Sequence, residues 1–475
     1  MATNPLRVHQ PHLLDPRVAK AQPGLELANT FGVMVKGRSR FESETYDDRK
    51  VSMKKLSSAL LSVMILFCAL NPLTSGAQKN AQAPVLTKEQ WREDLRYFAK
   101  ELAKRHKNLF HSVSREEFER AVAELDTAIP SLEDHQIIVR MHQIGARVGD
   151  GHTGVHLPSY FKLYPFGLYW FGRDLRVTGA PVEYESALGA RVVKIGAFGI
   201  NEVQARVLSC FPSAENENEW YVMNTSPSFI SRPEVLHTLG IVPDTGRAPF
   251  TFEDDQGKQF TLEVTPIAPP PAVRGAIALT GMRPAAKSQP LSRQKSGESF
   301  WFTHLADSQT TYVNFRRYDS LGDHARSLFA FIKSNPTKRL VIDLRQNGGG
   351  DFFQGRNHLI RPLKDLPAIN QKGRLFVIIG RRTFSAAMVN AIDFRKETNA
   401  ILVGEPIGER PNSYSENDEM TLPNSRLEVS YSTRYYKFLD EDVPAVMPDK
   451  RIDPNWTDFK AGRDPVMDWI LSQPD

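Results

Sequence analysis

Residues 340–404 constrain the fold of this chain more than any other stretch. They contain L-V-I-D-L-R-Q-N-G-G-G, later G-R-R-T-F-S-A-A-M, and then A-I-L-V-G-E. This order predicts a buried strand ending in a triple-glycine loop, a second strand that delivers a serine to a helix start, and a third strand. A serine at such a turn beside glycines suits acyl transfer, because the glycine amides and the amide after the serine can face a developing oxyanion.

Strands and helices alternate throughout residues 299–475. The predicted strands are rich in Val, Ile, Leu and Phe: Thr310–Phe315, Leu340–Leu344, Leu375–Ile379 and Ile401–Val403. The predicted helices between them are Asp323–Ser334, Phe353–Leu363 and Ser385–Lys396. Because continuous apolar strands that alternate with helices are buried on both faces, this range predicts an α/β layer with a largely parallel sheet. Glu428–Tyr436 alternates and predicts one further strand.

The rest of the chain has a different character, which predicts a multidomain α+β protein. Residues 78–158 have apolar side chains at three- and four-residue intervals and form a predicted helical region that ends in D-G-H-T. Residues 159–267 contain short β-rich runs, with a charged hairpin turn at Glu253–Gly257. Residues 268–298 are rich in Pro, Ala, Ser and Lys and are a predicted linker.

The D-L-R-x-N-x-G-G strand, the T-x-S-A segment and the V-G-E strand resemble the C-terminal processing (tail-specific) and tricorn-like serine peptidases. The resemblance covers roughly residues 88–475 and is strongest at 338–410. It implies a ClpP/crotonase-like catalytic core at 299–475, a PDZ-like domain at 159–267, and protein or peptide substrates. We expect no cofactor and no metal, since the sequence has neither a phosphate loop nor zinc-ligand spacing.

Ser385 is the predicted nucleophile, and Gly349, Gly350 and the Ala386 amide are the predicted oxyanion donors. The alternative role of Ser385 is a helix N-cap, which serine performs well. Triple glycines also occur in ordinary turns. The spacing to the V-G-E strand favours the catalytic interpretation.

The resemblance allows two kinds of general base. The tail-specific branch uses a lysine about 25 residues after the serine, where this chain has Arg410, which cannot release its proton near neutral pH. Lys396 and Lys437 do not have the expected position. The tricorn-like branch uses an N-terminal histidine, and D-G-H-T resembles that segment, so His152 is the predicted base. A structural role for His152 is the alternative.

The tricorn-like branch orients its histidine with a glutamate placed shortly before a P-D dipeptide. Here Asp440-Glu441-Asp442 precedes Pro448-Asp449, so the orienting carboxylate is predicted to be Glu441 or Asp442. The alternative is a solvated acidic turn.

Residues 53–77 have the anatomy of a secretory signal peptide: Met53-Lys54-Lys55, an apolar run, and small residues before Gln78. We therefore expect translation to start at Met53, with residues 1–52 an upstream extension, and an exported protein, periplasmic or extracellular, without stable membrane insertion once the signal is removed. Residues 1–77 carry ten Lys or Arg against six Asp or Glu, which leaves the remainder nearly neutral. No nucleic-acid partner is expected from such a balance.

Two other functions compete with a serine endopeptidase. The first is a non-catalytic ligand- or peptide-binding module on the same core, similar to the interphotoreceptor retinoid-binding proteins. The second is a periplasmic scaffold that holds protein tails with its strand-rich domain. The serine and the D-G-H-T segment favour the enzyme, because a carrier requires neither.

Overall fold

The computed structural model describes residues 85–269, 283–284 and 289–474. The expected upstream extension, the expected signal peptide and much of the linker lie outside these residues. In the described part of the chain, no helix is both long and apolar enough to cross a bilayer.

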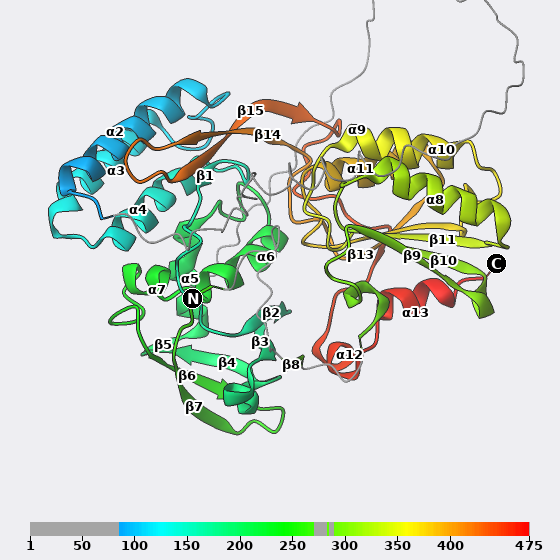
Figure 1. The fold of residues 1–475 in the computed structure, drawn as a ribbon, viewed down its shortest axis with the longest axis horizontal. Coiled ribbons are helices and arrows are strands. Elements are labelled where there is room, and N and C mark those ends of the chain that lie inside the picture. The colour runs from blue at the N-terminus through cyan, green and yellow to red at the C-terminus, as the bar shows by residue number, and fades with distance from the viewer. Residues whose placement is uncertain (1–84, 270–282, 285–288, 475) are drawn as a thin grey trace, which may run out of the picture. The chain divides into compact units, whose positions relative to one another are not determined.

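The C-terminal core is built on a six-stranded sheet, seen on the right in Figure 1. From β10 to β16 all neighbours are parallel, and only β9 pairs antiparallel with β10. Its strands, in spatial order, are β16 (Lys450–Arg451), β13 (Ile401–Gly404), β12 (Leu375–Ile379), β11 (Arg339–Asp343), β10 (Thr310–Phe315) and β9 (Phe300–Leu305). The largely parallel α/β layer is therefore confirmed.

Helices cover both faces of this sheet, which is why every residue of its central strands β11 and β12 is buried. One face packs on α8 (Leu321–Ser334), α9 (Phe352–Gly355), the π-helical turn η6 (Arg356–Ile360), α10 (Arg361–Lys364) and α11 (Ala386–Glu397). The other face packs on α13 (Pro465–Leu471), and the remaining short helices are η4 (Leu291–Arg293), η5 (Ala306–Ser308) and α12 (Trp456–Ala461). The helix predicted at Phe353–Leu363 is present but is interrupted by η6.

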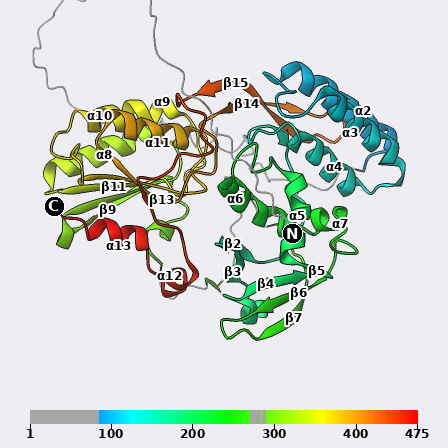
Figure 2. The same cartoon turned by 180° about the vertical axis from the view of Figure 1, so that it is seen from behind.

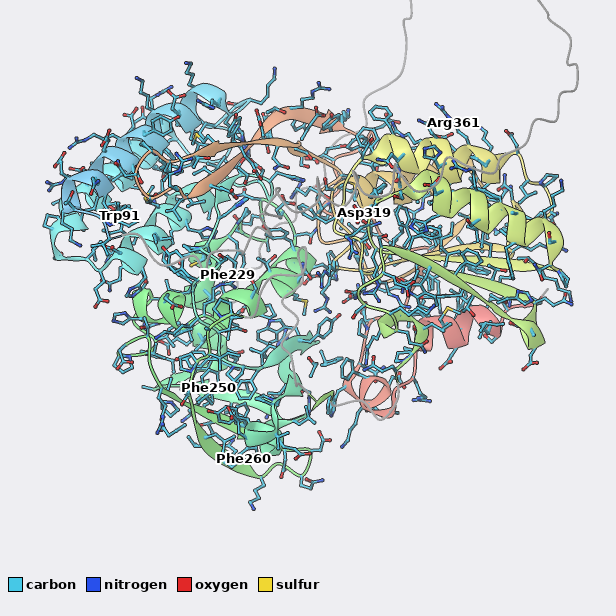
Figure 3. The ribbon with its side chains drawn as sticks, viewed as in Figure 1. Trp91, Phe229, Phe250, Phe260, Asp319 and Arg361 are labelled. Carbon is cyan, nitrogen blue, oxygen red and sulfur yellow. The ribbon has the colours of Figure 1, made fainter. Side chains whose placement is uncertain are left out.

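The strand-rich region contains a sheet in the order β2-β3-β4-β6-β7, with β5 beside β4 and β8 beside β3. Its strands are β2 (Gly167–Phe171), β3 (Asp174–Ala180), β4 (Arg191–Ile195), β5 (Phe198–Gly199), β6 (Ala248–Glu253), β7 (Gln259–Val264) and β8 (Arg283–Pro284). Its helices are η2 (Val182–Ala187), α5 (Ile200–Val207), η3 (Leu208–Cys210), α6 (Glu219–Ile230) and α7 (Pro233–Thr238). Aromatic rings fill its core, including the labelled Phe250 (Figure 3), which contacts Tyr164, Phe166 and Phe252.

The N-terminal region consists of α2 (Lys88–Arg105), α3 (Arg115–Ala128), η1 (Ile129–Ser131) and α4 (Asp134–Ala146), followed by β1 (Gly154–Val155). A capping box formed by Ser114 and Glu117 begins α3. The sheet β1-β15-β14 joins this region to the C-terminal half, because β14 (Asn412–Thr421) and β15 (Glu428–Lys437) form a hairpin that pairs with β1.

This hairpin crosses one of the domain boundaries predicted from the sequence. Residues 299–475 were expected to form one core, but the side chains of Leu422, Val429 and Tyr431 belong to the apolar cluster of the N-terminal helices. Both ribbon views show β14 and β15 extending from the core over α2 and α3 (Figure 2). Because β14 is mostly polar, its sequence did not predict that the hairpin would leave the core.

Candidate active site

Ser385 lies at the turn between β12 and α11, with φ 52° and ψ −124°. A non-glycine residue in this conformation is strained, and strained strand-to-helix turns are typical of nucleophile elbows. The Phe384 N–H donates to the Asn347 carbonyl at 3.1 Å and ties the turn to the glycine loop. Ser385 stands at the N-cap position, but none of the described amides of α11 donates to its side chain. The hydroxyl is therefore not used as a helix cap.

The glycine loop approaches the serine so closely that a side chain would not fit. A Cβ placed on Gly349 would lie 2.7 Å from the Cβ of Ser385 and 3.3 Å from its Oγ. Gly349 and Gly350 also have φ values of 110° and 150°, which favour glycine. The Gly349 N–H donates to Asn347 Oδ1 at 3.0 Å. Within the described residues, the amides of Gly350 and Ala386 have no hydrogen-bond partner, so they are the donors available to an oxyanion.

His152 lies beside the serine turn, on the loop that follows α4. Its ring stacks on that of Phe384, with centroids 4.8 Å apart. Its Nε2 is 3.3 Å from Ser415 Oγ on β14, and its Nδ1 is 3.8 Å from Glu409 Oε1. Burial lowers the pKa of His152 to about 4, because the charged imidazolium loses its hydration. The imidazole is therefore neutral at neutral pH and can accept a proton.

Glu409 connects the serine turn to the histidine. Its side chain is 1% exposed in a loop after β13, and its Oε2 accepts the backbone N–H of Ser385. Its Oε1 faces His152 Nδ1, and neither atom has a hydrogen-bond partner among the described residues. Burial, with the nearby carboxylate of Glu217, raises the pKa of Glu409 well above its usual range. Sequence analysis missed Glu409, although it precedes Arg410, the residue inspected in place of the tail-specific lysine.

Glu217 holds the two loops that carry these side chains. One carboxylate oxygen accepts the Gly151 N–H at 2.7 Å, and the other accepts the Arg410 N–H at 3.1 Å. Glu217 is 1% exposed, and burial raises its pKa to about 7. Because Gly151 precedes His152 and Arg410 follows Glu409, this carboxylate fixes the distance between histidine and acid. No local sequence pattern indicated it.

Asp150 supports the histidine loop from the other side. It accepts the His152 N–H at 3.1 Å and the Ser432 hydroxyl at 2.8 Å, and pairs with His106 Nε2 at 2.9 Å. Although burial opposes it, hydrogen bonds from His106, His111 and Ser432 hold the pKa of Asp150 well below its usual range.

Two clusters have the residue types of metal ligands, His106–His111–Asp150 and Glu133–His135–His237, each with atoms within 4.8 Å of one another. In the first cluster His106 Nδ1 accepts the Asn108 N–H at 3.0 Å, so its Nε2 carries the proton donated to Asp150. Hydrogen bonding within the protein accounts for His106 and Asp150 without an ion, whereas His111 Nε2 lies 3.7 Å from the Asp150 carboxylate.

The structure does not bring Glu441 or Asp442 to His152. Both are exposed in the loop after β15. The Asp442 carboxylate lies 3.7 Å from Arg410 Nη1, and the Glu441 carbonyl accepts from Asn412 Nδ2 at 3.0 Å. Glu441 and Asp442 therefore belong to an exposed acidic turn, which was the alternative interpretation. The acid that faces the histidine is Glu409.

Neither lysine considered as a base has a hydrogen bond to Ser385 within the described residues. Lys396 lies in the last turn of α11, about 16 Å along the helix axis from Ser385, and its Nζ donates to the Phe438 carbonyl at 2.7 Å. Lys437 is exposed at the end of β15. Among the described lysines considered, none therefore competes with His152.

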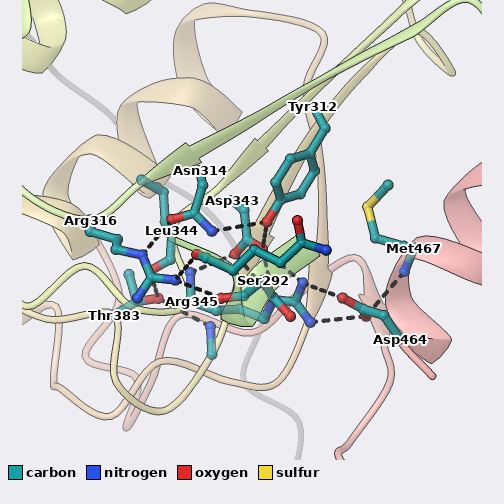
Figure 4. Close-up of polar contacts among 12 residues, drawn as sticks. Ser292, Tyr312, Asn314, Arg316, Asp343, Leu344, Arg345, Thr383, Asp464 and Met467 are labelled. Carbon is teal, nitrogen blue, oxygen red and sulfur yellow. Dashed lines mark hydrogen bonds and ion pairs between the residues drawn. The ribbon is translucent and has the colours of Figure 1, made fainter. Parts of the chain in front are cut away.

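The D-L-R segment has a structural role at the end of β11. Arg345 pairs with Asp343 and Asp464, each at 2.7 Å, and Asp343 also accepts the Tyr312 hydroxyl at 2.6 Å (Figure 4). These bonds anchor α13 to the sheet and fix the start of the glycine loop.

A cavity of about 810 Å³ opens beside the glycine loop, with Gly348 and Gly349 in its wall. The strand-rich region contributes Tyr169 and Phe171 to its lining. Its volume is within the range of sites that bind small molecules or peptide side chains.

The comparisons with known proteins agree with this geometry. Residues 309–455, which include Ser385 and Glu409, match the model of peptidase family S41. None of the curated proteins matches the sequence.

Two solved structures of CPAF share the fold. A CPAF mutant superimposes with a TM-score of 0.56 at 10% identity, covering 82% of this chain and 99% of that chain. Mature CPAF complexed with lactacystin gives a TM-score of 0.52 at 10% identity, covering 81% and 98%. The resemblance drawn from the D-L-R, T-x-S-A and V-G-E segments is confirmed: residues 309–455 match peptidase family S41, and the chain is similar to the tail-specific and tricorn-like serine peptidases.

Proposed function

We propose that this protein is an exported serine endopeptidase that cleaves peptide bonds through an acyl-enzyme on Ser385. His152 is the general base, and Glu409 orients it. The observation that carries this assignment is the position of the Glu409 carboxylate, which contacts the backbone of Ser385 with one oxygen and faces His152 with the other.

The proposed reaction begins with attack of Ser385 Oγ on the scissile carbonyl. His152 Nε2 exchanges its contact with Ser415 for Ser385, takes the hydroxyl proton, and returns it to the leaving amine. The amides of Gly350 and Ala386 stabilise the oxyanion, and Gly349 joins them if its N–H is released from Asn347. Water then attacks the acyl-enzyme, with His152 again accepting the proton, and frees Ser385.

Glu409 acts only when His152 becomes charged. Burial disfavours a charge on either side chain alone, and the reacting form of the site is the one in which Glu409 is ionised and His152 is neutral. When the imidazole takes the serine proton, a carboxylate opposite Nδ1 stabilises the imidazolium and keeps Nε2 directed at the serine.

Labelling with a fluorophosphonate probe tests the proposal. We expect wild-type protein to be labelled, and Ser385→Ala and His152→Ala to lose labelling. Ser415→Ala separates the two serines near His152, and His156→Ala is a matched control, because His156 lies four residues away with its side chain half exposed. Labelling that survives Ser385→Ala but is lost in Ser415→Ala would reject Ser385 as the nucleophile.

Export is proposed from the sequence of residues 53–77. Expression in a bacterial host followed by cell fractionation tests it, together with mass spectrometry of the purified N-terminus. We expect processed protein beginning near Gln78 outside the cytoplasm. An unprocessed cytoplasmic chain would contradict export.

A further inference from the structure

The cluster of Glu133, His135 and His237 takes part in no step of the proposed reaction. Glu133 and His135 lie at the start of α4, and His237 lies in the last turn of α7. The two helices pack against each other, and both ribbon views show them side by side (Figure 1, Figure 2). The loop that carries His152 follows the other end of α4, so about 20 Å of helix separates the cluster from it.

The two histidines face each other through their ring nitrogens. His135 Nε2 is 2.9 Å from His237 Nδ1, and the ring centroids are 5.1 Å apart. Two imidazoles bound to one tetrahedral zinc ion have their nitrogens about 3.3 Å apart, because each Zn–N bond is about 2.0–2.1 Å long. An opening of about 0.4 Å would therefore let both nitrogens bind the same ion.

Glu133 adds a carboxylate to this pair. Its Oε2 lies 3.5 Å from His135 Nδ1, and one ligand atom from each of the three residues lies within 4.8 Å of the others. The side chain of His135 is 13% exposed, whereas that of Glu133 is 70% exposed and free to reorient. Two imidazoles and one carboxylate are a donor set that zinc accepts, with water as its fourth ligand.

This cluster differs from the one formed by His106, His111 and Asp150. There, His106 is engaged at both ring nitrogens, by Asp150 and by the Asn108 N–H. Among the described residues, the rings of His135 and His237 have no hydrogen-bond partner other than each other. A metal ion would therefore replace a single hydrogen bond within the protein.

We propose that Glu133, His135 and His237 bind one Zn²⁺ ion. The sequence shows no zinc-ligand spacing because the two histidines are 102 residues apart and only the packing of α4 on α7 brings them together. The ion ties the N-terminal helices to the strand-rich region and stabilises the fold. It has no role in cleavage at Ser385, so the inference is independent of the proposed peptidase function.

Titration of the untagged full chain with ZnCl₂ tests the site, followed by isothermal titration calorimetry and by thermal unfolding. We expect saturable binding of one equivalent at this site and a rise in the midpoint of unfolding of roughly 2–5 °C at saturation, because only the folded chain holds the three ligands together. Co²⁺ in place of Zn²⁺ should give the strong visible absorption of tetrahedral coordination.

His135→Gln and His237→Gln should each weaken binding by at least about tenfold and remove the thermal shift. Glu133→Gln should weaken binding as well, and because its side chain is exposed it leaves the packing of the helices intact. His358→Gln is the matched control, since His358 is exposed on η6 outside the cluster. Unfolding of each variant without metal separates loss of a ligand from loss of structure.

No saturable binding to the wild-type chain would overturn the site, and so would binding that all three Gln variants retain at wild-type strength. Removal of metal with EDTA should leave fluorophosphonate labelling unchanged. Labelling that is lost with EDTA and restored by zinc would contradict the structural role of the ion. A chain that binds zinc through these residues but is never labelled would support the zinc site and reject only the proposed peptidase function.

Discussion

At the scale of single residues, the site depends on two buried groups that face each other without a hydrogen bond. His152 Nδ1 and Glu409 Oε1 are 3.8 Å apart, and both are removed from water. A dry environment disfavours charge on either side chain at rest, but it strengthens their attraction once a proton reaches the imidazole. In the proposed mechanism, with Glu409 ionised, the energy of this contact is available mainly in the transition state, where it would accelerate the reaction.

Glu409→Gln should test this contact directly. An amide cannot stabilise the imidazolium, so we expect kcat to fall by roughly 10²–10⁴-fold with little change in KM. Steady-state cleavage of an internally quenched peptide measures both constants. Glu441→Gln is the matched control, and it should stay within about twofold of wild type. A larger loss in Glu441→Gln than in Glu409→Gln would restore the acid predicted from the sequence.

The burial of His152 predicts an unusual pH profile. A general base works only in its unprotonated form, so kcat/KM should rise with pH through the pKa of His152. Because burial lowers that pKa to about 4, the histidine limb should have its midpoint near pH 4. Glu409→Gln shows this limb alone, since Glu409, whose pKa burial raises, adds its own ionisation to the wild-type profile. A pH series from 3.5 to 8 with the same peptide measures it. A midpoint near 6.5 would indicate a solvated imidazole, contrary to the observed burial.

At the scale of elements, the sequence predicted those parts whose signal is local. Strands such as β11 and β12 were foreseen because every residue in them is buried and their apolar runs are continuous. The strand β14 was not foreseen, because most of its residues are polar and its stability comes from pairing with β15. Glu409 and Glu217 were missed for a related reason. Their function depends on burial against segments more than 190 residues away, which no local spacing reveals.

The glycine loop is the element in which sequence and geometry agree most closely, and Gly349→Ala tests it. A Cβ at Gly349 would enter the space of Ser385, and φ of 110° is strained for alanine. We expect labelling by the fluorophosphonate to slow by at least about 100-fold, comparable to the loss of an oxyanion donor.

Gly348→Ala is the control for this substitution. A Cβ at Gly348 meets no atom within 4 Å, and its φ is not positive. It should label at nearly the wild-type rate and unfold at the wild-type temperature. Equal losses in the two variants would mean that general loosening of the loop, and not the approach to Ser385, explains the effect.

At the scale of the whole chain, the active site is assembled from segments that are distant in sequence. The hairpin β14–β15 leaves the C-terminal core and packs on the N-terminal helices, where Asp94 accepts the Asn424 and Ser425 N–H groups at 2.8 and 2.7 Å. The same hairpin carries Ser415, which contacts His152, and Ser432, which contacts Asp150. Stability of the hairpin and placement of the base should therefore be coupled.

Leu422→Ala should reveal this coupling, because Leu422 is fully buried in the N-terminal cluster at the tip of the hairpin. Loss of this side chain should lower the free energy of unfolding by about 2–5 kcal/mol. Urea titrations followed by circular dichroism and by fluorophosphonate labelling should shift together, since unfolding of the hairpin releases the His152 loop. Leu471→Ala, at a partly exposed position on α13, should change stability by no more than about 0.5 kcal/mol. If labelling persists after the circular-dichroism signal of the helices is lost, His152 would stay in place without the N-terminal helices. That result would contradict the coupling.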